Sequence, residues 1–131
     1  MSVFLKAIAS VLEVKQIGLD DNFRDVPEWC SLKAFGLLVM MENDFSTPLT
    51  ISDLNRYQTV RDLYREAFRT FISSLLGLKR NQITDSSTYG DFPEWDSVNH
   101  LRLVMESEKR FGVHYELERI PSIKYIDDFL Q

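Results

Sequence analysis

Apolar side chains recur at three- and four-residue intervals over long stretches of the sequence, which is the spacing of amphipathic helices. This spacing predicts a first helix over residues 2–15, with Ser2 as its N-cap, and a second over residues 31–44. Ser46-Thr47-Pro48 ends the second helix, because proline cannot continue it. A short helical turn is expected over residues 51–55. This part of the chain therefore predicts helices throughout.

A third apolar stripe is longer than the others and has no breaker inside it. Thr59-Val60-Arg61-Asp62 has the spacing of a capping box, with Asp in place of the usual Glu. Neither Gly nor Pro occurs between Thr59 and Gly77, so we expect one unbroken helix there, although a kink or short break near Arg65 would leave the same pattern. Its apolar members are Val60, Leu63, Tyr64, Ala67, Phe68, Phe71, Ile72, Leu75 and Leu76.

The same plan then repeats in the second half. A polar loop is expected from Thr84 to Pro93, followed by a helix that starts at Ser97 and ends at Gly112. A short segment over residues 116–120 is expected to stop at Pro121. Ser122 is then expected to cap a final helix that contains Ile123, Ile126, Phe129 and Leu130.

Two nearly identical pentapeptides lie 66 residues apart in this 131-residue chain. They are Pro27-Glu28-Trp29-Cys30-Ser31 and Pro93-Glu94-Trp95-Asp96-Ser97. A repeat at half the chain length indicates two copies of one unit, which we place at residues 1–65 and 66–131. The predicted fold is all-α: two tandem four-helix bundles, joined by a continuous helix that ends the first copy and opens the second.

Charge and composition exclude several classes of function. The net charge is −5, from 15 basic and 20 acidic residues, and the absence of a basic run argues against a nucleic-acid partner. A single cysteine cannot form an intramolecular disulfide, and with two histidines it makes a zinc site unexpected. No long apolar run suggests a signal peptide or a membrane span, so we expect a cytoplasmic protein. The sequence leaves the oligomeric state open, with a monomer as the expectation.

Ser31 and Ser97 each stand at the start of a predicted helix, after a loop. A serine there commonly caps the helix by accepting a hydrogen bond from a backbone N–H. The alternative is a serine that bears a phosphate or phosphodiester, which the free N–H groups and the dipole of the helix start would stabilise.

The second copy resembles the acyl carrier protein family, also called phosphopantetheine-binding domains. The first copy is similar to that family at Cys30-Ser31-Leu32, and the second copy is the closer match. The resemblance of the second copy is carried by Trp95-Asp96-Ser97-Val98, similar to the family's Asp-Ser-Leu signature, and by Leu103-Val104, Glu108, Phe111 and Ser122-Ile123. In the first copy the further matching residues are Leu37, Glu42, Phe45 and Thr59-Val60.

The resemblance implies a carrier rather than an enzyme. It implies that Ser97 bears 4′-phosphopantetheine transferred from coenzyme A, that Ser31 is a second candidate attachment residue, and that Asp96 contributes to recognition by the transferase. The cargo would be an acyl or aminoacyl thioester, as in fatty acid or polyketide biosynthesis. The implied partners are a phosphopantetheinyl transferase, an acyl-loading ligase and acyl-transferring or condensing enzymes.

The first copy departs from the family pattern at Cys30, where the family has Asp, and at Gly36. An alternative function therefore stays open: an unmodified carrier-fold module for protein interaction, with the first copy as a structural or docking domain. His100 is expected to lie on the surface or to contact a partner, because a Ser-His hydrolase would need further groups. Trp29 and Trp95 are each expected to pin their loop onto the bundle.

Overall fold

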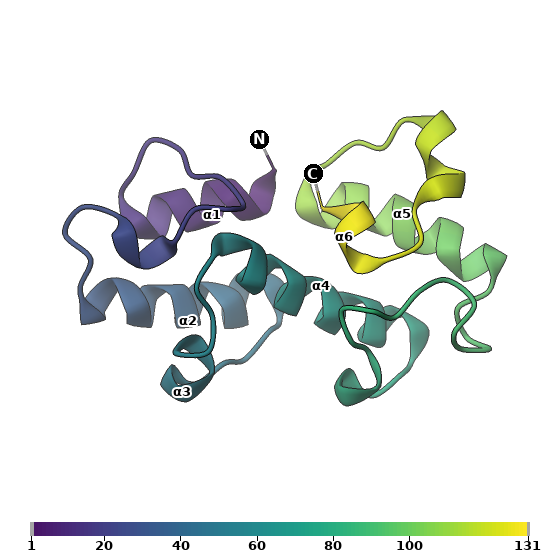
Figure 1. Ribbon diagram of the computed structural model, residues 1–131, viewed down its shortest axis with the longest axis horizontal. Helices are drawn as coiled ribbons and strands as arrows, with labels where there is room; N and C mark the ends of the chain where they lie inside the picture. The colour runs from purple at the N-terminus through teal and green to yellow at the C-terminus, as the bar shows by residue number, and fades with distance from the viewer. Residues whose placement is uncertain (1, 131) are drawn as a thin grey trace. The chain divides into compact units, whose positions relative to one another are not determined.

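The computed structural model describes residues 2–130, and the part that it describes is helical, with two isolated β-bridges and no strand. The all-α class predicted from the sequence is thereby confirmed. The α-helices, shown in Figure 1, are α1 (Val3–Leu12), α2 (Ser31–Phe45), α3 (Ile51–Leu54), α4 (Val60–Leu76), α5 (Ser97–Phe111) and α6 (Ile126–Phe129). Three short 3₁₀ helices accompany them: η1 (Phe23–Asp25), η2 (Arg80–Gln82) and η3 (Leu117–Ser122).

The chain divides into two compact units, and the division falls inside α4. The first unit runs from Val3 to Ala67 and the second begins at Phe68. The unbroken helix expected between Thr59 and Gly77 is confirmed, and so is its capping box. The Thr59 Oγ1 accepts from the Asp62 N–H at 3.3 Å, and an Asp62 carboxylate oxygen accepts from the Thr59 N–H at 3.1 Å.

Aromatic packing forms the core of the first unit. The Phe4 ring of α1 stacks on the Tyr64 ring of α4, with centroids 4.4 Å apart, and tilts against the Phe45 ring of α2 at 4.9 Å. All three side chains are buried. Figure 1 shows α1 lying along α2, and Gly36 permits this close approach. A Cβ at Gly36 would lie 3.0 Å from a methyl group of Val11.

The second unit builds its core in the same way around Phe68. This ring stacks on Phe111 of α5 at 4.8 Å and tilts against Phe129 of α6 at 5.1 Å. Phe68 thus takes the part that Phe4 has in the first unit.

The first helix is shorter than predicted, because α1 ends at Leu12 rather than at residue 15. Glu13 adopts the left-handed conformation (φ 58°), and the next N–H, that of Val14, donates back to the Ala9 carbonyl at 3.0 Å. Such a left-handed residue is the usual end of a helix, but it is normally a glycine. The second unit has that glycine: Gly77 (φ 72°) ends α4 in the same manner.

Ser122 does not cap the final helix, so that prediction is wrong. The 3₁₀ helix η3 continues through Pro121 to Ser122, and the Ser122 hydroxyl donates to the Arg119 carbonyl at 2.6 Å. The final helix α6 begins only at Ile126, after Tyr125.

A carboxylate holds the start of this last helix in both units. Asp128 accepts from the backbone N–H groups of Lys124 and Tyr125 at 2.9 and 3.0 Å. Asp62, 66 residues earlier, accepts from the N–H groups of Gln58 and Thr59 at 2.9 and 3.1 Å. The residues that correspond to Thr59-Val60 are therefore Tyr125-Ile126 and not Ser122-Ile123. In each unit an aspartate, Asp62 or Asp128, fixes the residue at which the helix begins.

The two isolated bridges keep the same 66-residue spacing. One joins Asn22 to Thr59 in the first unit, and the other joins Thr88 to Tyr125 in the second. Each bridge fastens the loop between the unit's first two long helices to the residue that precedes its last helix.

None of the helices within residues 2–130 combines the length and the apolar character needed to cross a membrane.

The left-handed Glu13 generates a stability prediction. Replacing Glu13 with Gly should stabilise the protein by roughly 0.5–1 kcal/mol, because a left-handed side-chain-bearing residue costs about 1–2 kcal/mol and added chain flexibility offsets roughly half of that. Urea unfolding followed by circular dichroism measures the change. Gly77→Ala is the matched control and should destabilise. A lower stability for Glu13→Gly would show that this turn is not strained.

Candidate functional site

Ser31 and Ser97 occupy the same position in two helices of equal length. Each is the first residue of a 15-residue helix, α2 or α5, and each is exposed. The first N–H groups of a helix have no partner within it, and the helix dipole places partial positive charge there. Each serine hydroxyl is thus presented to solvent where an attached anion would be stabilised.

The residue before each serine has the same extended backbone but a different capping ability. The Asp96 carboxylate accepts a hydrogen bond from the Asn99 N–H at 2.9 Å and so caps α5. Cys30 stands at the N-cap of α2, and its side chain makes no capping hydrogen bond. The substitution therefore removes both a cap and a negative charge beside Ser31.

A side chain two residues after each serine holds the preceding loop. The Lys33 ammonium donates to the Pro27 carbonyl at 3.1 Å, and the Asn99 amide donates to the Glu94 carbonyl at 2.7 Å. The Pro-Glu-Trp segment is therefore fastened to the first turn of the helix in both units.

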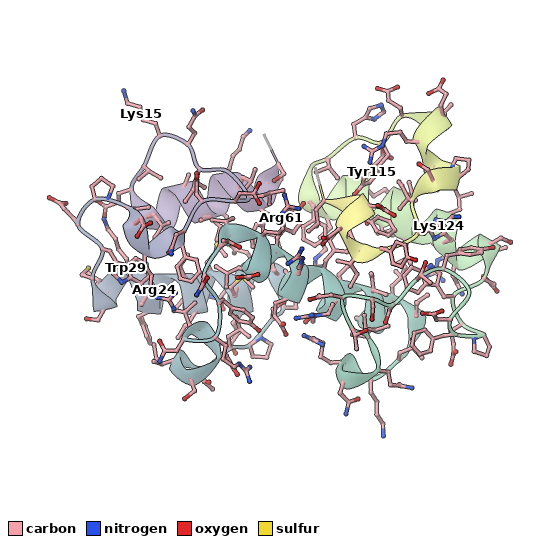
Figure 2. The ribbon with its side chains drawn as sticks, viewed as in Figure 1. Lys15, Arg24, Trp29, Arg61, Tyr115 and Lys124 are labelled. Atoms are coloured by element: carbon pink, nitrogen blue, oxygen red, sulfur yellow. The ribbon has the colours of Figure 1, made fainter. Side chains whose placement is uncertain are left out.

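Trp95 pins its loop onto the bundle, as the sequence predicts. Its side chain is 1 % exposed, and its indole N–H donates to the Nδ1 of His100 at 3.0 Å. Trp29, shown in Figure 2, is half-buried and packs on the Phe23 ring at 5.8 Å. A buried hydrogen bond thus holds Trp95, whereas Trp29 packs against an aromatic ring.

The expectation that His100 lies on the surface is wrong. Only 8 % of the residue is exposed, and its ring meets the rings of Tyr89 at 4.8 Å and Phe129 at 6.0 Å, edge to face. A buried indole N–H needs an acceptor, and His100 supplies it one turn into α5. Burial lowers the pKa of His100, and hydrogen bonds with the backbone of Ile123 and Ile120 oppose this effect without cancelling it.

A pocket of about 330 Å³ adjoins Ser97. Its walls are mostly apolar and include the exposed residue Lys124, whose side chain Figure 2 labels. Sequence reasoning missed this pocket, because its walls come from three segments that meet only in the fold. The residues that line it include Tyr89, Ser97, His100, Ile120, Ile123 and Lys124.

The first unit has a pocket of about 530 Å³ beside Cys30, between the end of α1 and the start of α2. Cys30 and Leu32 line it, whereas Ser31 between them does not. Cys30 is an exposed free thiol. Within residues 2–130, no group of His, Cys, Asp and Glu side chains is placed to hold a metal ion.

The helix face that follows each serine is apolar and exposed. Three large side chains recur at equivalent positions of the two helices, so a partner that docks beside either serine would meet them. They are Leu32, Phe35 and Val39 on α2, and Val98, Leu101 and Met105 on α5.

Comparison with known proteins gives one family. The sequence model of a family described as "Phosphopantetheine attachment site" matches residues 2–67, which is about half of the chain. No curated protein and no solved structure gives a significant match. The matched region contains Ser31 and coincides with the first unit, so the expectation that the second copy is the closer match to the family is not supported.

The different caps lead to a reciprocal stability prediction. Cys30→Asp should stabilise the protein by about 1 kcal/mol, since aspartate supplies the missing cap of α2. Asp96→Cys should destabilise it by about the same amount, since α5 loses its cap. Urea unfolding of both variants and of the double exchange measures this. Equal stability of all four proteins would show that neither side chain contributes to its helix start.

Proposed function

The chain belongs to the phosphopantetheine-attachment family, and from this we propose that it is a tandem carrier protein with one 4′-phosphopantetheine arm on Ser31 and one on Ser97. Domains of this family are the site at which that group is covalently attached. The observation that carries the proposal is the identical placement of two exposed serines, each at the first residue of a 15-residue helix, one of them inside the matched region. Each compact unit would be one carrier domain.

The serines fit the chemistry of attachment. The serine oxygen forms a bond to the phosphorus that bears the pantetheine group of coenzyme A, and the bond from that phosphorus to the remaining nucleotide breaks. Adenosine 3′,5′-bisphosphate leaves, and the hydroxyl proton passes to a base of the transferase. The resulting phosphodiester is an anion at a helix N-terminus, which the free N–H groups stabilise.

The two attachment residues differ in their acidic neighbour. Asp96 places a carboxylate beside Ser97, and we propose that the transferase recognises it. Cys30 offers no such charge to the transferase, so attachment at Ser31 should be slower. Membership of the family nonetheless rests on the unit that contains Ser31.

The partners and cargo follow from a carrier role. The thiol of a phosphopantetheine arm holds acyl or aminoacyl groups as thioesters. We therefore propose a phosphopantetheinyl transferase, an acyl-loading ligase and acyl-transferring or condensing enzymes as partners. Carrier domains are typically not catalysts themselves, and the exposed apolar faces of α2 and α5 suit enzymes that dock beside the serines.

Intact-mass measurement tests the proposal directly. The full chain is incubated with coenzyme A and a promiscuous phosphopantetheinyl transferase, and two arm masses should be added. Ser97→Ala and Ser31→Ala should each remove one addition, and the double variant should remove both. Cys30→Ala is the matched control, because it changes a neighbour of Ser31 without removing a hydroxyl.

The outcomes separate the two functions considered. One addition that vanishes only in Ser97→Ala would restrict the carrier role to the second unit and contradict an arm on Ser31. No addition to protein that circular dichroism shows to be folded would overturn the carrier proposal. An unmodified interaction module would then be the function that the exposed faces support.

The acidic neighbour should set the rate of attachment. Cys30→Asp should raise the initial rate at Ser31 roughly tenfold, and Asp96→Asn should lower the rate at Ser97 by about as much, since a charge-assisted contact contributes about 1.5 kcal/mol. Time-resolved peptide mapping of each serine gives both rates in one reaction. Unchanged rates would show that the transferase does not read this position.

A further inference from the structure

An arginine ties two backbone carbonyls together in the first unit. The guanidinium of Arg24, labelled in Figure 2, donates to the carbonyls of Tyr57 at 2.5 Å and Leu54 at 2.7 Å. Its carbon lies 4.6 Å from the centre of the Phe23 ring. Arg24 therefore fastens η1 to the end of α3 and to the segment that follows it.

The second unit cannot make this contact in the same way. The residue 66 positions after Arg24 is Gly90, which has no side chain. The counterparts of Leu54 and Tyr57 are Ile120 and Ile123. The backbone of these two residues interacts instead with the His100 ring, which comes from α5. The first unit has Ala34 at the position of His100. The equivalent backbone is therefore contacted by an arginine of η1 in the first unit and by a histidine of α5 in the second.

The second unit thus uses a histidine, which titrates, where the first unit uses an arginine, which stays charged. Arginine stays protonated at every pH at which proteins fold, so its bonds to carbonyls do not depend on pH. The His100 Nδ1 accepts the indole N–H of Trp95, and it can do so only without a proton. Protonation would set two N–H donors against each other inside a buried contact.

The surroundings of His100 do not favour its charged form. The residues that line the pocket with it include no carboxylate, and its ionisable members are the Tyr89 phenol and the Lys124 ammonium. On α6 the Asp128 carboxylate is used by backbone N–H groups, and at the start of α5 the Asp96 carboxylate caps the helix. A proton on His100 would thus add positive charge to a site that already has a cation.

We propose that the hydrogen-bonded pair Trp95–His100 is an acid-sensitive fastener of the second unit. A proton on His100 breaks the pair, releases Trp95 and loosens the loop over residues 88–96 that leads to Ser97. The first unit, held by Arg24, does not respond. Ser97 lines the same pocket as His100, so its surroundings change with the proton while those of Ser31 do not.

The sign of the pH dependence follows from burial. Because the pKa of folded His100 lies below its ordinary value of 6.5, the unfolded chain takes up this proton first. The fastener's contribution is complete above pH 6.5 and is lost as the pH falls through the folded pKa. Burial raises the pKa of Asp62, but hydrogen bonds from Gln58 and Thr59 together with the charge of Arg65 hold it below 3.8, so its contribution is lost only in stronger acid.

Nuclear magnetic resonance titration of the full chain, without an arm, tests the proposal from about pH 7.5 to about pH 5. The His100 ring should titrate below the ordinary histidine value of 6.5. The Trp95 indole N–H signal should shift and lose protection from exchange with the midpoint of His100. The Trp29 indole signal should stay constant and serves as the internal control.

A conservative variant separates titration from packing. In His100→Asn the amide oxygen can accept from Trp95 and its NH₂ can donate to a carbonyl, but nothing titrates. The variant should keep the neutral-pH fold and lose the acid-induced change of Trp95. The proposal is overturned if His100 titrates at or above its ordinary value of 6.5, if Trp95 does not follow His100, or if His100→Asn keeps the change.

A second readout rests on the proposed function and uses both serines in one chain. The rate of arm attachment at Ser97 relative to Ser31 should change on acidification across the His100 midpoint and stay constant in His100→Asn. If no arm is attached at any pH, the carrier proposal fails while the titration still decides the fastener. An unchanged ratio in a chain that does take up arms would show that the fastener does not reach Ser97.

Discussion

Each unit depends on hydrogen bonds that tie a long polar loop to the segment before its last helix. The loops between the first two long helices contain only one short 3₁₀ helix each, and an untied loop of that length would have many conformations. The bridges Asn22–Thr59 and Thr88–Tyr125 fasten them, and Asp62 repeats this support at the helix start. Only a loop that is held in this way can present a serine hydroxyl at a defined helix end.

The two compact units share the geometry of these ties and differ in their chemistry. Arg24 binds two carbonyls in one unit, and His100 reaches the equivalent backbone in the other from a different helix. Asp96 caps one serine helix, and Cys30 leaves the other uncapped. The fold therefore constrains where a polar contact is needed more tightly than which residue makes it, so units with the same geometry can differ in their properties.

Local patterns were enough to predict the long helices and both serines at helix starts. They failed where a contact distant in sequence, or a stronger local competitor, decided the structure. Ser122 is an adequate N-cap by itself, but the Asp128 carboxylate holds a later start. Glu13 ends α1 in a conformation that its side chain disfavours. The burial of His100 depends on η3, α6 and Trp95 together, so the spacing of residues within α5 does not predict it.

The position of the unit division inside α4 has a consequence for inheritance. A cut between Ala67 and Phe68 would interrupt a helix in which each N–H bonds to a carbonyl four residues earlier. It would also leave the Phe68 ring, which packs on Phe111, at a chain end. A recombination break at this point would therefore damage both compact units. We expect the two units to be inherited together, while each can still diverge in sequence.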